Sequence, residues 1–546
     1  MDNNVFTSQT LWEGFDPGLE QLDTVIVKQI ETNGIVSKDL YFTGRAVEHG
    51  QTRVFATVCH KGTSKDKPAV LVIGGFDKRI EEDVLLDLAS RGFVAMSIDF
   101  AGRREVGLYT IYPDELEYCN LDAAKSMFEI NQTARETKMY EYVLNCRRAI
   151  TYLLQEEHVK SVSVLSSING VFVGIMVLGV DDRVKNGALL FGNIFRNFPE
   201  PNSDEKRLKM DDDDFDKHLA YEMEKQMWTL GLAPQAYALQ IKVPVYIVNS
   251  ANSPYVDIAQ TSKTFFRLNG ESRLLILPTC MDCLPTRYTN DVVHWLKGYE
   301  AKPKSEISSF VDEKGDYCVR VKTTRPINKT SVWYCTSAEG MARYWTKATL
   351  TQSDNGYVAK LNLYEKQCTV ASFALFDDDV SVSTPLLIES ITANNPKKAS
   401  NIIFTGTGKQ NLITLAPGKA WWNQDVETKL APGYLNLIGA KGTSLATFAI
   451  NDKSIRIDPA FTLGFDVCSN VRQQIKLTAV CKFGHWIQRY SQTAEVFGTG
   501  KWERVTFDKC NFRRDTDGRQ LTESEKVDLL TISADSEFIV NNIFLV

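Results

Sequence analysis

Apolar and polar residues alternate in two different rhythms along the chain, and the first rhythm covers roughly the first 300 residues. An apolar run over 69–73 ends in a Gly-Gly pair, a helical stretch follows over 81–91, and a second apolar run spans 94–99. Short apolar runs bounded by turn residues are typical of buried strands, and longer amphipathic stretches are typical of helices. The same pattern predicts further strands over 161–165, 188–191, 243–249 and 274–277, and helices over 139–155 and 292–299. Strands that alternate with helices predict a parallel sheet covered on both faces.

The rhythm changes after about residue 302. Residues 303–390 carry short alternating strands, such as 317–322, without a convincing long helix, which is typical of a small β-sandwich. Residues 391–546 form a second series of short strands separated by glycines, which predicts a jelly roll. The sequence therefore predicts an α/β domain over 1–302, followed by two all-β domains.

A polar insertion occupies about residues 193–240 of the first domain. Segments inserted at this point of an α/β sheet usually cover the ends of the strands, so we expect a cap here. The insertion contains the acidic run Asp211–Asp214, which we interpret as a solvated loop or the start of a helix rather than as a metal site.

The bulk composition restricts the partners and the location of the protein. The formal net charge is −6, and no stripe of Lys and Arg is visible that would follow a phosphate backbone. The chain starts without the basic and apolar regions of a signal peptide, and its longest apolar run, Val171–Val180, is too short to span a bilayer. Its eleven cysteines are scattered, which is typical of reduced thiols. We therefore expect a cytoplasmic protein that binds neither nucleic acid nor a membrane.

The turn after the strand at 161–165 carries a damaged catalytic motif. In G-x-S-x-G, a serine nucleophile sits at the tip of a sharp turn between strand and helix, and small residues on both sides relieve the crowding. Here the turn reads Ser166-Ser167-Ile168-Asn169-Gly170. Ser166 replaces the first glycine, Ile168 takes the place of the nucleophile, and Gly170 keeps the last position. An isoleucine cannot attack a carbonyl carbon.

A register shifted by one residue would make Ser167 the nucleophile. Leu165 and Asn169 would then occupy the two crowded positions, which a tight turn disfavours. Ser167, and more distantly Ser166, stay open as replacement nucleophiles on this interpretation.

Several segments around this turn resemble one enzyme family. GGFDKRIEEDVLLDLASRGFVAMSIDFAGR, MYEYVLNCRRAITYLL and DDRVKNGALLFG, in this order, are similar to the acetyl xylan esterase and dienelactone hydrolase branch of the α/β-hydrolases, over about residues 40–298. The resemblance implies an α/β-hydrolase fold and a triad in the chain order Ser, Asp, His. It also implies that the loop at Gly74 supplies an oxyanion-hole amide, with Gly75, Phe76 and Asn169 as the candidate residues.

The positions that the resemblance assigns to the acid and the base are also changed. Ser253 stands where the aspartate follows the strand VPVYIVNS, and Asp282 stands nearest to the place of the histidine after LLILP. None of the six histidines falls in that loop, and His294 lies in the predicted closing helix, where we expect it to pack or face solvent. Loss of the base alone costs a serine hydrolase on the order of 10⁴ in rate. With Ile168, all three triad positions differ, so we do not expect a working Ser-His-Asp triad.

The loop of the lost base contains a C-x-x-C pair, Cys280 and Cys283. Such a pair can be a redox centre or half of a zinc site, but no second pair of metal ligands is visible, and the setting is not thioredoxin-like. We favour two incidental cysteines, and a replacement thiol nucleophile stays open. We expect no metal site or cofactor in this domain.

Aromatic residues gather in the last domain. Trp421 and Trp422, then Trp486 and Tyr490, precede GTGKWERVTFDKCNF and a closing FIVNNIFLV. Over about residues 400–546 this pattern resembles galactose-binding-like jelly rolls, the fold of many carbohydrate-binding modules. The resemblance implies aromatic faces that stack on sugars and a possible structural calcium ion, for which no ligands can be named. Alternatively, Trp502 and one of the Trp421–Trp422 pair fill the core.

Three functions follow from these observations. The first is a catalytically degenerate relative of carbohydrate esterases, with a binding or architectural role, a small-molecule or carbohydrate partner and a possible homo-oligomeric state. The second is an active ester hydrolase that uses Ser167, Ser166, Cys280 or Cys283. The third is a sugar-binding module in the C-terminal domain.

Overall fold

The structure is a computed structural model, which describes residues 5–546 apart from a set of short gaps. The gaps are 63–64, 77–79, 124–125, 131, 202–214, 279, 301–304, 325–328, 337–339, 354–355, 378, 407–411, 416–420, 425–427 and 485. The chain divides into two compact units. The first comprises Met1–Val248, Ala259–Leu274 and Val292–Glu300, and the second comprises Asn249–Ile258, Leu275–Asp291 and Ala301–Val546.

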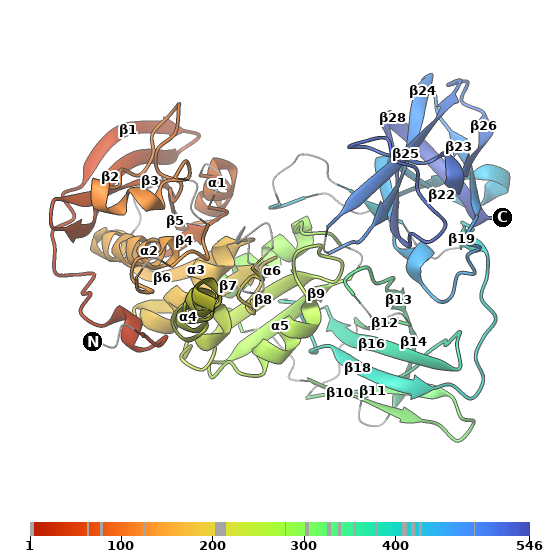
Figure 1. The fold of residues 1–546 in the computed structure, drawn as a ribbon, viewed down its shortest axis with the longest axis horizontal. Coiled ribbons are helices and arrows are strands. Elements are labelled where there is room, and N and C mark those ends of the chain that lie inside the picture. Colours follow the sequence, from red (N-terminus) through yellow and green to blue (C-terminus); the bar gives the residue numbers. More distant parts are fainter. Residues whose placement is uncertain are drawn as a thin grey trace. The chain divides into compact units, whose positions relative to one another are not determined.

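The first unit is built on a mixed sheet (Figure 1). Its strands are β1 (Val25–Thr32), β2 (Ile35–Val47), β3 (Gly50–Lys61), β4 (Lys67–Ile73), β5 (Val94–Ile98), β6 (Val159–Ser167), β7 (Val184–Leu190), β8 (Val245–Ser250) and β9 (Ser272–Leu277), in the order β1-β2-β3-β5-β4-β6-β7-β8-β9. From β5 to β8 the neighbours are parallel, as predicted. The expectation of a parallel sheet is wrong for β1, β2 and β3, which are antiparallel to their neighbours. All eight residues of β1 are exposed, so the strand shows no alternation of buried and exposed positions that a sequence pattern could reveal.

Helices join the parallel strands, as the alternation predicts. They are α1 (Glu82–Ser90), α2 (Lys138–Gln155), α3 (Gly170–Val180), α4 (Phe215–Gly231), α5 (Ile258–Phe265) and α6 (Thr286–Leu296). The closing helix α6 begins six residues before the predicted start at 292, because its first turns carry polar residues outside the apolar pattern. The insertion near 193–240 contributes α4, and its acidic run Asp211–Asp214 lies outside the described residues. No helix among the described residues is long and apolar enough to cross a membrane.

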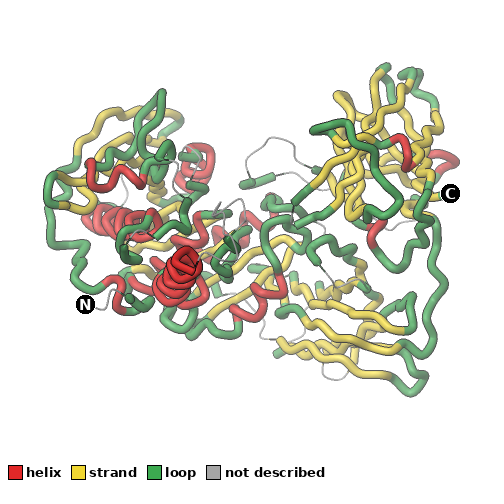
Figure 2. The backbone as a smooth tube through the Cα atoms, viewed as in Figure 1, coloured by secondary structure: helices red, strands yellow, loops and turns green. Residues whose placement is uncertain are grey.

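The second unit is dominated by antiparallel strands, drawn in yellow in Figure 2. One group of strands forms a small sheet in the order β10 (Ser305–Val311), β11 (Tyr317–Thr323), β15 (Gly356–Lys360) and β14 (Thr349–Ser353). A second group follows β9 in the strand order of its sheet: β17 (Val382–Ser383), β16 (Gln367–Phe376), β12 (Thr330–Cys335) and β13 (Thr346–Lys347), with β18 (Leu387–Thr392) also paired to β16. These strands agree with an all-β region after residue 302.

A second all-β region follows, organised around one long strand. Its strands are β19 (Ile402–Phe404), β20 (Ile413–Thr414), β21 (Lys429–Pro432), β22 (Ile438–Thr447), β23 (Thr462–Cys468), β24 (Gln473–Cys481), β25 (Gln488–Val496), β26 (Trp502–Asp508), β27 (Arg513–Arg514) and β28 (Val527–Leu545). Along its 19 residues β28 pairs with β24, β22, β23 and β19, so a single strand links most of the region. Buried side chains such as Phe465, Leu477 and Val540 form one core between these strands. The jelly-roll topology and the domain boundary at 390 stay predictions.

Helix α3 packs very closely against strand β6. It is apolar on all sides, and a Cβ at Gly174 would lie 1.9 Å from Ser166 Oγ and 2.6 Å from Ser166 Cβ. The absent side chain of Gly174 therefore makes room for the serine that replaces the first glycine of the motif.

We expect Gly174→Ala to lower the free energy of unfolding by about 1–3 kcal/mol, because the added methyl group overpacks the contact with Ser166. In a Ser166→Gly background the same change should be neutral or slightly stabilising. The contact with the serine side chain is then absent, and alanine is favoured over glycine in a helix interior by about 0.5–1 kcal/mol. Denaturant unfolding of the four proteins measures this coupling. Equal costs in the two backgrounds would contradict the proposed contact.

Candidate functional site

The turn between β6 and α3 keeps the backbone of a nucleophile elbow. Ile168 has a φ of +52°, a left-handed conformation that costs a β-branched residue about 1–3 kcal/mol. Its amide donates a hydrogen bond of 2.9 Å to the carbonyl of Leu190. A Cβ at Gly192 would lie 2.3 Å from Ile168 O, so the turn is crowded on this side. The structure therefore places Ile168 at the tip of the turn.

The neighbouring serines belong to the strand. Ser167 pairs with Leu190 and Ser166 with Leu189, so both lie in the extended ladder of β6. Both side chains are buried, and neither hydroxyl has a hydrogen-bond partner among the described residues. No described base therefore prepares either hydroxyl for attack.

The candidate oxyanion loop lies directly against this turn. A Cβ at Gly170 would lie 2.3 Å from the carbonyl oxygen of Ile73 and 2.5 Å from that of Gly74. Gly75 is half-buried, while Phe76 is buried with its ring 5.6 Å from that of Phe100. Asn169, the residue before α3, is exposed. The structure thus brings the end of β4 and the start of α3 together, as the resemblance implies.

In the second unit, the positions assigned to the acid and the base bond to each other. Ser253 Oγ donates a hydrogen bond of 2.8 Å to Asp282 Oδ2 and accepts bonds from the amides of Tyr255 and Val256 at 3.1 and 3.0 Å. The amide of Asp282 donates to Ser250 Oγ at 2.8 Å. Since the oxygen of Ser253 already accepts two amide protons, its lone pairs are engaged and it is a poor nucleophile.

The carboxyl group of Asp282 is held in an environment that disfavours its charge. Burial raises its pKa to about 7, although hydrogen bonds from Ser253 and Ser250 oppose the shift. Its Oδ1 is shielded from solvent and has no hydrogen-bond partner among the described residues. The backbone at Asp282 is also left-handed, with a φ of +40°. Asp282 is thus a carboxyl group that can gain or lose a proton near neutral pH.

The two cysteines that flank Asp282 are in contact. Cys280 Sγ lies 3.2 Å from Cys283 Sγ and donates a hydrogen bond of 3.0 Å to the Cys283 carbonyl. Cys280 is buried and Cys283 is half-buried. No cluster of three or more His, Cys, Asp or Glu side chains that could hold a metal ion occurs in the described parts of the chain. The pair is therefore a thiol pair without the further ligands that zinc needs.

Three of the four aromatic residues of the expected sugar platform in the C-terminal region, Trp421, Trp422 and Tyr490, are buried. Trp421 and Trp422 are each 5% exposed and pack edge to face, with ring centroids 5.3 Å apart. Tyr490 is fully buried and its hydroxyl donates to Glu525 Oε1 at 2.6 Å. Trp486 is 61% exposed. A sequence pattern cannot separate these roles, because tryptophan and tyrosine serve equally as core residues and as stacking surfaces.

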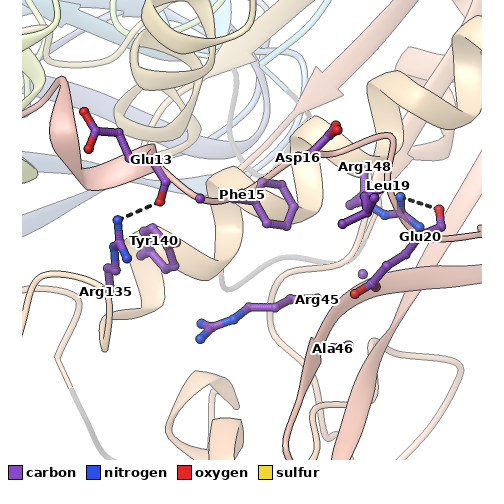
Figure 3. Close-up of a pocket in the computed structure, with 12 residues that line it drawn as sticks. Glu13, Phe15, Asp16, Leu19, Glu20, Arg45, Ala46, Arg135, Tyr140 and Arg148 are labelled. Carbon is purple, nitrogen blue, oxygen red and sulfur yellow. Dashed lines mark hydrogen bonds between the residues drawn. The ribbon is translucent and has the colours of Figure 1, made fainter.

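A cavity at the N-terminal segment was not foreseen from the sequence (Figure 3). Its volume is about 280 Å³, and arginines Arg45, Arg135 and Arg148 line it. Arg148 donates to the carbonyls of Pro17, Glu20, Gln21 and Thr43, and Arg135 to those of Leu11, Glu13 and Thr10. Arg45 pairs with the fully buried Glu141, whose pKa burial raises to about 7. Arg135 and Arg148 thus anchor residues 10–21, and Arg45 joins β2 to α2, so the cavity has a structural explanation.

A larger cavity of about 510 Å³ lies within the second unit. The residues that line it come from the β9–α6 loop and from both all-β regions: Leu277, Pro278, Cys280, Pro285, Thr286, Arg287, Tyr288, Ser331, Trp333, Lys347, Leu375, Asp377, Leu412, Ile413, Gln424 and Thr428. We call it the β-region cavity. Arg287 lies 3.4 Å from Asp377 and stacks over the ring of Tyr288. No local sequence pattern could reveal this site, because the residues that line it are up to 151 positions apart (277 to 428).

The comparisons with known proteins bear on the fold alone. No family model and no curated protein matches the chain. Acetyl xylan esterase from Paenibacillus sp. R4 is 14% identical over 54% of this chain and 92% of its own, with a TM-score of 0.40. Acetyl xylan esterase 1 from Thermoanaerobacterium sp. JW/SL YS485 is 15% identical over 52% and 89%, with a TM-score of 0.39. A dienelactone hydrolase-like promiscuous phosphotriesterase from metagenomic libraries is 14% identical over 46% and 84%, with a TM-score of 0.29.

These neighbours are α/β-hydrolases that overlap about the N-terminal half of the chain. They do not test the jelly roll expected over 391–546.

The raised pKa of Asp282 predicts a specific dependence of stability on pH. A carboxyl group whose pKa rises on folding binds its proton more tightly in the native state, so its contribution to stability falls as the pH rises from about 4 to about 7. Asp282→Asn removes this titration. We expect the free energy of unfolding of the variant, relative to wild type, to increase by about 2–4 kcal/mol across that range and then to level off.

Urea unfolding at a series of pH values measures the difference. Glu141 also titrates near neutral pH, but it is present in both proteins and cancels. Ser253→Ala is the matched control, because it removes the hydrogen-bond partner and leaves the carboxyl group in place. A constant difference between Asp282→Asn and wild type from pH 4 to 8 would contradict the prediction.

Proposed function

We propose that the chain is an esterase-fold protein that has lost Ser-His-Asp chemistry and serves as a binding or architectural protein. One observation carries the proposal: Ile168 occupies the tip of the turn in the strained conformation of a nucleophile. The rest of the machinery is altered in a consistent way, since Ser253 and Asp282 stand at the other two positions and bond to each other.

The alternatives within the turn lack a base. Ser166 and Ser167 are buried in β6 without hydrogen-bond partners in the described residues. A serine hydroxyl that no base deprotonates is a very weak nucleophile at neutral pH. This supports a degenerate site over an active hydrolase that uses Ser167.

The β-region cavity supports the binding part of the proposal. Its volume of about 510 Å³ lies within the range of small-molecule sites. Its wall combines the aromatic rings of Tyr288 and Trp333 with the charged groups of Arg287, Lys347 and Asp377. Aromatic rings next to polar groups suit a sugar, and the sequence resemblance to carbohydrate esterases favours the same class. We therefore propose a carbohydrate or a similar polar small molecule as the ligand.

Ester hydrolysis tests the first part of the proposal. We expect wild type to hydrolyse p-nitrophenyl acetate at the rate of the buffer background, and Ser167→Ala to leave that rate unchanged. A fluorophosphonate probe should label no serine, while an active serine esterase in the same assay labels fully. Turnover that disappears in Ser167→Ala, or in the alanine variants of Cys280 or Cys283, would replace the proposal with the active hydrolase.

Calorimetric titration of the full chain tests the ligand class. With a panel of neutral mono- and oligosaccharides, we expect a binding heat for wild type and an affinity that Trp333→Ala lowers about fivefold or more, because stacking on an aromatic ring contributes about 1 kcal/mol or more. Trp486→Ala is the matched control, since this exposed tryptophan lies outside the cavity. No heat with any sugar would contradict the carbohydrate assignment. Loss in Trp486→Ala alone would place sugar binding on the C-terminal surface.

A further inference from the structure

We propose that Cys280 and Cys283, in the loop between β9 and α6, form a reversible dithiol–disulfide pair, which exchanges with small disulfides such as oxidised glutathione. The proposal assigns a redox modification site to the loop between β9 and α6. It is independent of the esterase question, because it concerns bond formation between two thiols and no ester substrate.

The geometry brings the two sulfur atoms into contact before any reaction. They lie 3.2 Å apart, and a disulfide bond needs about 2.0 Å, so closure requires a movement of only about 1.2 Å. The left-handed backbone at Asp282 turns the short loop back on itself between the two cysteines. Pro278 and Pro285 flank the loop and restrict its backbone. Oxidation therefore needs a local adjustment rather than a rearrangement of the sheet.

The surroundings make the two thiols unequal. Cys280 is 5% exposed and lines the cavity, while Cys283 is more accessible. The two sulfur atoms are within hydrogen-bond distance of each other, and the single Cys280 proton is shared between Cys283 Sγ and the Cys283 carbonyl oxygen. This hydrogen bond lowers the pKa of Cys283, while the contact with Cys283 and burial raise that of Cys280. Cys283 therefore suits the role of the attacking thiolate, and Cys280 that of the resolving thiol.

The exchange balances with a small disulfide as the oxidant. The Cys283 thiolate attacks one sulfur of the small disulfide, whose S–S bond breaks and releases one small thiolate. A mixed disulfide is then present on Cys283. Cys280 loses its proton to solvent and attacks the sulfur of Cys283, which releases the second small thiolate. The two protein thiols are oxidised, and the small disulfide is reduced to two thiols.

Asp282 connects this pair to the degenerate site. It lies between the two cysteines, and its carboxyl group accepts the hydrogen bond from Ser253. Closing the disulfide moves the backbone on both sides of Asp282. The oxidation state of the pair therefore acts on the Ser253–Asp282 bond and on the cavity wall formed by Cys280.

The test uses the full chain and oxidised glutathione. After incubation and blocking of the remaining thiols, peptide mapping of wild type should show a Cys280–Cys283 disulfide that dithiothreitol reverses. Cys510 should carry glutathione instead, because its thiol is exposed. Its modification serves as an internal measure of the reaction. A map in which Cys510 is fully modified and both Cys280 and Cys283 are still free thiols would overturn the proposal.

Two single variants test the assigned roles. Cys280→Ser should accumulate glutathione on Cys283, since the resolving thiol is absent, and Cys283→Ser should leave Cys280 mostly unmodified under the same conditions. Thermal unfolding confirms that each variant is folded, and the wild-type map decides the proposal if a variant does not fold. Glutathione on Cys280 in preference to Cys283 would overturn the assignment of the attacking thiol.

Discussion

The tight turn at Ile168 is the constraint on which the first unit depends. The packing of α3 against β4, β6 and β7 leaves room for no side chain at Gly170, Gly174 or Gly192, where an added Cβ would approach its neighbours to 2.3 Å or less. This packing requires the left-handed backbone at Ile168 whatever its side chain does. A β-branched residue is the least suited to such a conformation, so its presence indicates that the turn is needed for the fold as well as for a nucleophile. The residue at position 168 can therefore differ from a nucleophile while the turn between β6 and α3 stays the same.

Ser253 and Asp282 form a buried hydrogen-bonded pair in the second unit. A buried polar group without a partner costs about 1–3 kcal/mol, so polar residues at the positions that the resemblance assigns to the acid and the base need hydrogen-bond partners. The Ser253 hydroxyl and Asp282 Oδ2 satisfy each other, and the amides of Tyr255 and Val256 satisfy Ser253 further, while Asp282 Oδ1 has no partner among the described residues. The raised pKa of Asp282 follows from burial, whose effect outweighs that of the hydrogen bonds with Ser253 and Ser250. What the resemblance assigns to acid and base chemistry is a structural contact in this chain.

The parallel strands, most helices and the register of the degenerate motif could be predicted from the sequence, because each depends on local apolar runs or on crowding within five residues. Strand β1 could not, since all its residues are exposed and it depends on pairing with β2 for its structure. The burial of Trp421, Trp422 and Tyr490 could not either, because an aromatic residue suits a core and a sugar surface equally. The β-region cavity is assembled from segments far apart in sequence, and no local pattern reports such an assembly.

The groups that retain reactive chemistry lie together on the loop between β9 and α6. Within four positions it carries a thiol that lines a cavity, a carboxyl group that titrates near neutral pH, and a second thiol with a lowered pKa. The resemblance places a histidine base on this loop, where it must be positioned accurately and yet be accessible. In this chain the loop has a left-handed turn at Asp282 and buries Cys280, with no histidine among its residues. Those same properties hold two sulfur atoms in contact and a carboxyl group in partial enclosure, so the loop to which the resemblance assigns the base is where, among the described residues, our proposal places new chemistry.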